Sequence, residues 1–101
     1  MIHRAKRVDA NQAVIVQAFR KCGALVIDLS ASGKGVMDIL VSHRGRWLAV
    51  EIKDGAKFAS QQALTPAQVK LHDEVAATGN EVHIVRCVDD ALALLAYHIS
   101  P

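Results

Sequence analysis

Two apolar segments joined by a short polar turn constrain the fold of this chain more than any other feature. Val36–Ser42 and Trp47–Lys53 are rich in β-forming residues, and His43-Arg44-Gly45-Arg46 lies between them. With Arg44-Gly45 as a two-residue loop, the pattern predicts a tight β-hairpin. Both strands carry apolar residues on both faces, which predicts helices on both sides of the sheet.

The predicted hairpin register brings two acidic residues and a lysine together. If His43 pairs with Arg46, then Asp38 faces Glu51, and directly opposed side chains have Cβ atoms ~4.5–5.5 Å apart. Lys53 lies two residues beyond Glu51 and points to the same face. A register shift of one residue would separate the two acids, so the prediction depends on the turn.

The other residues of the hairpin are assigned to faces by the same alternation. Leu40, Trp47 and Ala49 are predicted to share the acidic face. The apolar neighbours of the charged residues are predicted to point to the opposite face; they are Met37, Ile39, Val50 and Ile52. Trp47 is interpreted as a core or sheet-end aromatic residue rather than a platform for base stacking.

Helical spacing predicts three helices around this hairpin. The first is capped by Asp9, has Gln12 at N3, and extends to Cys22 before Gly23. The second opens with Thr65-Pro66-Ala67-Gln68, where Thr65 is the N-cap and Gln68 the N3 residue, and extends to about Thr78. The third is Ala91–His98, capped by Asp89 or Asp90.

Two further strands complete the expected architecture. Ala24–Leu29 and Glu81–Val88 are read as strands, and 30–35 and 54–64 as loops. The order α-β-β-β-α-β-α then gives an antiparallel meander of three strands and a right-handed crossover to a parallel fourth. We expect one α/β domain over residues 1–101, a three-layer α/β/α fold with a mixed four-stranded sheet, and a loose basic arm at residues 1–7.

Opposed carboxylates in a covered sheet need a compensating partner. Like charges directly opposed destabilise a sheet, and a divalent cation or a shared proton would offset that repulsion. Mg²⁺ takes oxygen ligands, often one or two carboxylates, and an adjacent lysine can stabilise charge on a phosphate. The alternative is a small assembly domain in which Glu51 is only salt-bridged to Lys53 on an exposed strand face.

Composition and spacing exclude several other classes of protein. The chain is 51% apolar and 22% charged, as globular proteins are, and its net charge of +2 alone does not indicate a polyanionic partner. No apolar run is long enough to span a membrane, and no signal-peptide pattern is present, so we expect a cytoplasmic protein. Cys22 and Cys87 are expected to be reduced. The five histidines have no zinc-ligand spacing, and no Ser/His/Asp or Cys/His set can be argued from spacing.

The motifs resemble those of the PD-(D/E)xK nuclease superfamily. Within it, the chain looks most like small VRR-NUC-type and phage-encoded nucleases related to Holliday-junction resolvases. The likeness covers Asp9 to about Leu95, and the element order is similar to the αβββαβ core of that superfamily. The matching segments are Gly35-Val-Met-Asp38, Trp47-Leu-Ala-Val-Glu51-Ile-Lys53, Leu64-Thr-Pro-Ala-Gln68 and Val82-His-Ile-Val-Arg-Cys87 followed by Val88-Asp-Asp-Ala-Leu92.

The resemblance implies a specific site and activity. Asp38 and Glu51 would bind Mg²⁺ or Mn²⁺ with the main-chain carbonyl of Ile52, and Lys53 would position the attacking water and stabilise the phosphate. Gln68 would face the site, although it fits equally well as the capping-box partner of Thr65. The implied function is hydrolysis of phosphodiester bonds in DNA, including branched DNA, by a homodimer. The alternative is a non-catalytic nucleic-acid-binding module on the same fold.

Basic side chains are candidates for phosphate contacts. Lys34, Arg44, Arg46 and Lys57 are interpreted as loop residues near the site, and Arg4, Lys6 and Arg7 as additional contacts on the arm.

Two positions depart from the pattern of the family. Met37 stands where the superfamily's name-giving proline would be. Val14 stands at the inward-facing position of the first helix, where relatives often carry a metal-binding glutamate. Other oxygen ligands on that helix are limited to Asp9, Asn11, Gln12 and Gln17, which argues against a second metal site.

Overall fold

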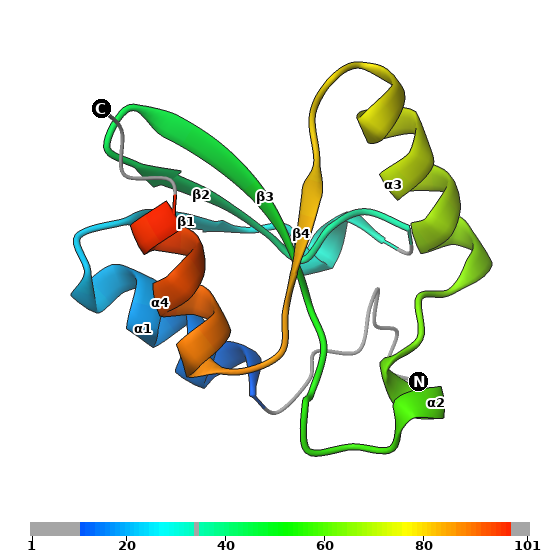
Figure 1. Cartoon of the computed structure of the whole chain (residues 1–101), viewed down its shortest axis with the longest axis horizontal. Helices are drawn as coiled ribbons and strands as arrows, with labels where there is room; N and C mark the ends of the chain where they lie inside the picture. The colour runs from blue at the N-terminus through cyan, green and yellow to red at the C-terminus, as the bar shows by residue number, and fades with distance from the viewer. Residues whose placement is uncertain (1–10, 34, 98–101) are drawn as a thin grey trace.

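A single mixed sheet of four strands organises the protein. The computed structural model describes residues 11–33 and 35–97, and the strand order in its sheet is β1-β2-β3-β4 (Figure 1). The β1–β2 and β2–β3 pairs are antiparallel, whereas β3 and β4 are parallel. The strands are β1 (Leu25–Asp28), β2 (Ile39–His43), β3 (Arg46–Ile52) and β4 (Val82–Val85).

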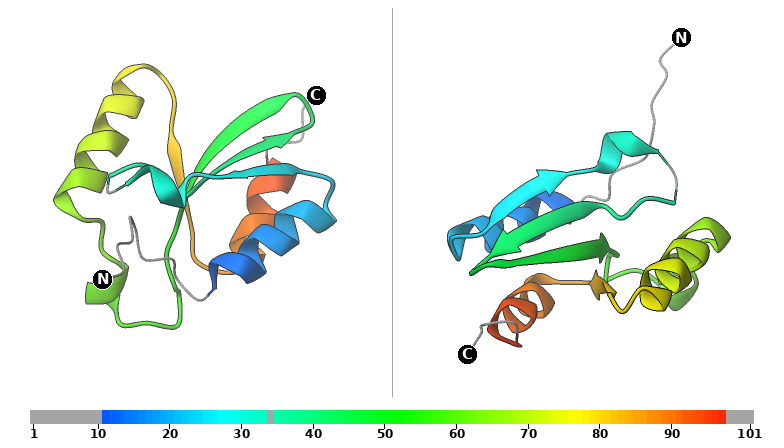
Figure 2. Two further views of the ribbon diagram at one scale, coloured as in Figure 1. Left: turned by 180° about the vertical axis from the view of Figure 1, so that it is seen from behind. Right: turned by 90° about the horizontal axis from the view of Figure 1, so that it is seen from above.

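Helices cover both faces of this sheet. Helices α1 (Gln12–Lys21) and α4 (Val88–Tyr97) pack together on one face, and α3 (Pro66–Ala77) lies on the other (Figures 1 and 2). A 3₁₀ turn at Ser30–Ser32 and the short helix α2 (Ala59–Gln62) lie within segments predicted as loops. The predicted three-layer α/β/α architecture is confirmed. In the described part of the chain, no helix is long and apolar enough to cross a membrane.

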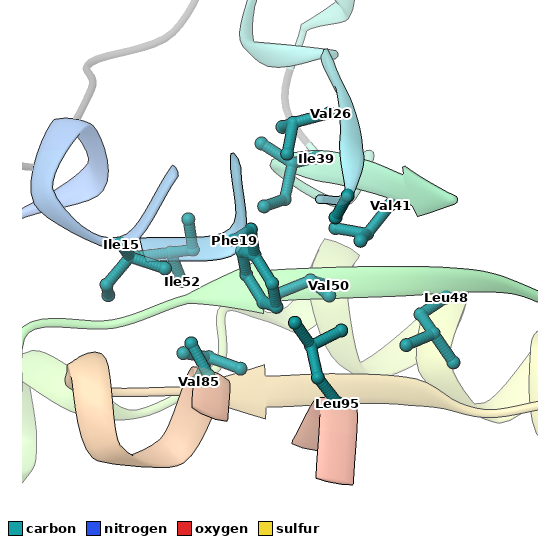
Figure 3. Close-up of a cluster of buried hydrophobic side chains, with 12 residues drawn as sticks. Ile15, Phe19, Val26, Ile39, Val41, Leu48, Val50, Ile52, Val85 and Leu95 are labelled. Atoms are coloured by element: carbon teal, nitrogen blue, oxygen red, sulfur yellow. The ribbon is translucent and has the colours of Figure 1, made fainter. Parts of the chain in front are cut away.

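The hydrophobic core lies between the sheet and the α1–α4 pair. Ile15 and Phe19 are one helical turn apart on α1, and both point into this layer (Figure 3). Alternate residues of β2 and β3 meet them from the sheet, among them Ile39, Val41 and Val50. The sheet face toward α1 and α4 is therefore apolar, and the polar cluster lies on the opposite face.

The hairpin turn has the predicted geometry. Arg44 and Gly45 have φ angles of 50° and 82°, as a type I′ turn requires, and His43 pairs with Arg46. The register continues through Val41 and Leu48 as predicted. The alternation of faces along β3 is therefore fixed from its first residue.

The ladder changes at the start of β2. Ile39 pairs with Val50, and the backbone amide of Asp38 also donates to the Val50 carbonyl, at 3.1 Å. Asp38 and Ile39 on one strand thus both lie opposite Val50 on the other, as in a β-bulge. The prediction that Met37 points to the core face is wrong: Met37 lines a groove on the α3 side, because the extra residue at the bulge reverses the alternation.

Two predicted helix starts are displaced. Helix α1 begins at Gln12 with Asn11 at the N-cap, so Gln12 is the N1 residue and not N3; Asp9 lies outside the described residues. Helix α4 begins at Val88, which places Asp89 and Asp90 in its first turn and not at the cap. Acidic residues are favourable at both places because the helix dipole attracts them, so sequence alone does not separate the two.

Candidate active site

Three segments of the chain meet at the end of β3 and place four polar side chains together. Glu51 comes from β3, Lys53 directly follows the last residue of that strand, Asp38 comes from the bulge before β2, and Gln68 from the first turn of α3. All four are buried, and the Glu51 side chain is only 1% exposed. Buried charged groups are rare unless they are paired or hold a ligand, so this cluster is the candidate active site.

Asp38 occupies the place where the β2–β3 ladder would continue. Its Oδ2 atom accepts a hydrogen bond of 2.7 Å from the backbone amide of Ile52. The carboxylate therefore substitutes for a strand carbonyl and lies beside the Glu51–Lys53 segment. The predicted ladder pair between Asp38 and Glu51 is not formed, because the ladder ends at Ile39 and Val50.

Gln68 connects the lysine, the glutamate and the helix start. Its Oε1 atom accepts hydrogen bonds from Lys53 Nζ at 3.0 Å and from the Thr65 amide at 2.9 Å. Its Nε2 atom donates to Glu51 Oε2 at 3.0 Å, and its own amide donates to Thr65 Oγ1. The two interpretations left open by the sequence are thus both realised: Gln68 completes the capping box and also faces the cluster.

Sequence reasoning missed His72, which lies one helical turn after Gln68. Its Nε2 atom is 3.5 Å from Glu51 Oε1, and its side chain is 14% exposed. Burial lowers the pKa of His72, Lys53 acts in the same direction and Asp73 opposes it, so the imidazole is neutral at pH 7. The sequence did contain a signal: His72 lies four residues after Gln68 on a predicted helix, and residues with this spacing share one face of a helix.

The charges of the cluster suit a divalent cation. Two carboxyl groups and one amine lie together in a shielded position, and a bound divalent cation would stabilise the carboxyl groups in their ionised form. Mg²⁺ commonly takes one or two carboxylates and retains several waters. Within residues 11–33 and 35–97, no group of three or more His, Cys, Asp or Glu side chains is arranged to hold a metal. The residues present supply two carboxyl groups, which fit the hard oxygen ligands that a divalent cation such as Mg²⁺ takes.

Helix α1 reaches the cluster through its first residues. Asn11 Nδ2 donates to the Lys53 carbonyl at 3.0 Å, which ties the start of α1 to the end of β3. Val14 is 57% exposed, so the prediction that it occupies the inward-facing position is wrong. The inward face of α1 is formed by Gln12, Ile15 and Phe19, and Val14 lies ~100° around the helix from Ile15.

The basic residues are more dispersed than predicted. Lys57 follows β3 closely, in a turn closed by its amide on the Asp54 carbonyl. Arg44 and Arg46 lie at the hairpin turn, which is the far end of β3; five residues at ~3.3 Å each place Arg46 ~17 Å along the strand from Glu51. The prediction that both arginines lie near the cluster is therefore wrong. Lys34 lies outside the described residues.

Comparison with known proteins identifies a related fold. A solved structure described as a VRR_NUC domain superposes with a TM-score of 0.67 at 25% sequence identity, over 89% of this chain and 99% of that one. No family model matches the sequence. A search of curated proteins gives no significant match. Because the structural match covers nearly nine-tenths of this chain, it extends over most of the elements that carry the four-residue cluster.

Proposed function

We propose that this chain, which has the fold of the VRR-NUC nuclease-like superfamily, hydrolyses phosphodiester bonds in DNA with Mg²⁺ or Mn²⁺. The fold similarity indicates a nuclease-type function in general terms. The observation that carries the specific proposal is the burial of Asp38, Glu51 and Lys53 at the end of β3, where Gln68 links Lys53 to Glu51 and Asp38 accepts from the Ile52 amide.

Each residue of the cluster has a role that follows from its chemistry. Asp38 and Glu51, with the carbonyl of Ile52, would hold the cation, which when bound supplies Lewis-acid stabilisation of charge on the phosphate. Lys53 Nζ donates to Gln68 Oε1, which holds the ammonium beside Glu51. From there the ammonium orients the attacking water and donates to the phosphate oxygens as negative charge develops on them.

The proposed assembly is a homodimer acting on duplex or branched DNA. The edge strand β1 exposes Leu25 and Ile27, and an exposed apolar strand edge favours pairing with a second chain. A dimer would present two clusters to two strands. Light scattering is expected to give the dimer mass at micromolar concentration, and a monomer mass at every concentration would contradict the dimer.

The proposed activity is tested by incubating the protein with linear duplex, single-stranded, nicked and four-way-junction DNA. We expect cleavage with Mg²⁺ or Mn²⁺ and none with a chelator. Lys53→Ala is expected to lower the cleavage rate by ~10²–10³-fold, because a buried donor to the developing charge is lost. Lys21→Ala removes an exposed lysine from α1, on the opposite face of the sheet, and is the matched control with an unchanged rate.

The other outcomes identify the alternatives. Salt-sensitive DNA binding without cleavage under any metal would contradict the nuclease and support a nucleic-acid-binding module. If the protein shows no DNA binding and Mn²⁺ does not stabilise it thermally, the nuclease is contradicted. That result would support the small assembly domain in which Glu51 only pairs with a neighbour.

A further inference from the structure

A groove opens between the β2–β3 hairpin and the C-terminal half of α3. Its volume is about 540 Å³, within the range of small-molecule sites. Figure 1 shows the hairpin and α3 on either side of β4, and residues of both line the groove. Its apolar floor comes from the hairpin segment and its far wall from α3; these residues include Met37, Leu40, Trp47, Ala49, Val75 and Thr78.

Trp47 is the distinctive side chain of this groove. It is 57% exposed although it is the largest apolar residue type, and it is the single tryptophan in the chain. The prediction that it belongs to the core is therefore wrong, and its position at the sheet end is confirmed. A solvent-exposed indole with an apolar floor beside it offers a flat π-surface at low conformational cost.

The groove and the candidate active site lie on the same face of the sheet, at different points along β3. Trp47, Ala49 and Glu51 alternate along β3 and so lie on the same face of the sheet. Four residues at ~3.3 Å each separate Trp47 from Glu51 by ~13 Å along the strand. That distance corresponds to about four stacked nucleotides at ~3.4 Å each, and to fewer in an unstacked strand.

The charges around the groove favour a base over a phosphate. The wall formed by the end of α3 carries the negative pole of the helix dipole, and Glu81 lies beside it, 3.8 Å from His83 Nδ1. Both features repel a phosphate held inside the groove. Arg46 also lines the groove, at its hairpin end, where a guanidinium can contact the backbone of a strand whose base lies inside.

We propose that this groove is a base-binding subsite in which an unpaired nucleobase stacks on Trp47, up to about four nucleotides from the cleaved phosphate. The inference rests on the proposed nuclease function and specifies its substrate class. Because a base in duplex DNA is already stacked, the subsite favours nucleic acid with an unpaired base within reach of Trp47.

The fluorescence of Trp47 tests the subsite without any cleavage. The wild-type protein is titrated, in chelator, with a twelve-nucleotide oligothymidine and with an abasic strand of the same length and charge. We expect quenching by oligothymidine and little by the abasic strand, because only the former has bases to stack. Because neither Trp47→Ala nor Trp47→Phe contains a tryptophan, their binding is measured by the fluorescence anisotropy of end-labelled oligothymidine. Trp47→Ala is expected to weaken oligothymidine binding by about 5- to 100-fold, whereas Trp47→Phe retains most of it.

A matched aromatic variant shows whether the effect belongs to Trp47. Tyr97→Ala removes an exposed aromatic side chain from α4, in the opposite layer, and is expected to leave oligothymidine binding unchanged. Equal quenching by both strands, or none, would overturn the proposal. A change in tryptophan fluorescence on dilution without DNA would also overturn it, since a second copy of the chain would then cover Trp47. Because chelator prevents catalysis, a failed cleavage assay and a failed quenching assay remain distinguishable.

Discussion

Glu51→Gln is expected to abolish metal-dependent DNA cleavage, with a loss of at least ~10³-fold in rate. Glutamine has nearly the same shape as glutamate, but it removes a negative charge from the carboxylate pair that would hold the cation. The oxygen of the new amide can still accept the hydrogen bond from Gln68 Nε2, which measures 3.0 Å in the native protein. Cleavage of labelled DNA under single-turnover conditions measures the effect.

The stability of the same variant distinguishes lost metal binding from misfolding. In chelator, Glu51→Gln is expected to unfold at a temperature no lower than the native protein, because a buried charge has been removed and its hydrogen bond retained. Mn²⁺ is expected to raise the unfolding temperature of the native protein and not that of the variant. A variant that is stabilised by Mn²⁺ and still cleaves DNA would contradict the assignment of Glu51.

Phe19→Ala is expected to reduce the free energy of unfolding by ~3–5 kcal/mol. Phe19 is fully buried between α1 and the sheet, among Ile15, Val41 and Val50 (Figure 3). Its loss leaves a cavity in the principal core of a small domain, whose total stability is typically ~5–15 kcal/mol. Urea denaturation followed by circular dichroism measures the change.

Phe58→Ala is the matched control, because the chain contains two phenylalanines and Phe58 is 81% exposed. The same chemical change at that position is expected to alter the free energy of unfolding by less than ~0.5 kcal/mol. Equal losses for the two variants would contradict the assignment of the core to the α1 side of the sheet.

The hairpin register was the part of the fold most accessible from sequence. An Arg-Gly turn between two β-rich segments has few geometric solutions, so the pairing of His43 with Arg46 followed from local chemistry. The bulge at Asp38 could not be predicted in the same way. It depends on a hydrogen bond from the Asp38 amide to a carbonyl that also serves Ile39, and no residue type in the segment specifies that arrangement.

The site was predictable where it depended on strand alternation and not where it depended on helix placement. Glu51 and Lys53 share a face because they are two residues apart, and the capping pattern placed Gln68 at the start of α3. The orientation of Val14 depended on which stripe of α1 faces the sheet, and the apolar residues Val14, Ile15, Ala18 and Phe19 cover too wide an arc of the helix to fix that stripe from sequence. His72 was missed because its role depends on how α3 packs against β3.

The capping box of α3 has a consequence for the stability of the candidate active site. The first turn of a helix is ordinarily among the earliest parts of a structure to fray. Here the side chain that closes this turn is also the one that joins the ammonium of Lys53 to the carboxylate of Glu51. Opening this single turn would therefore separate the lysine from the glutamate, so that local unfolding of α3 and loss of the candidate site become one event.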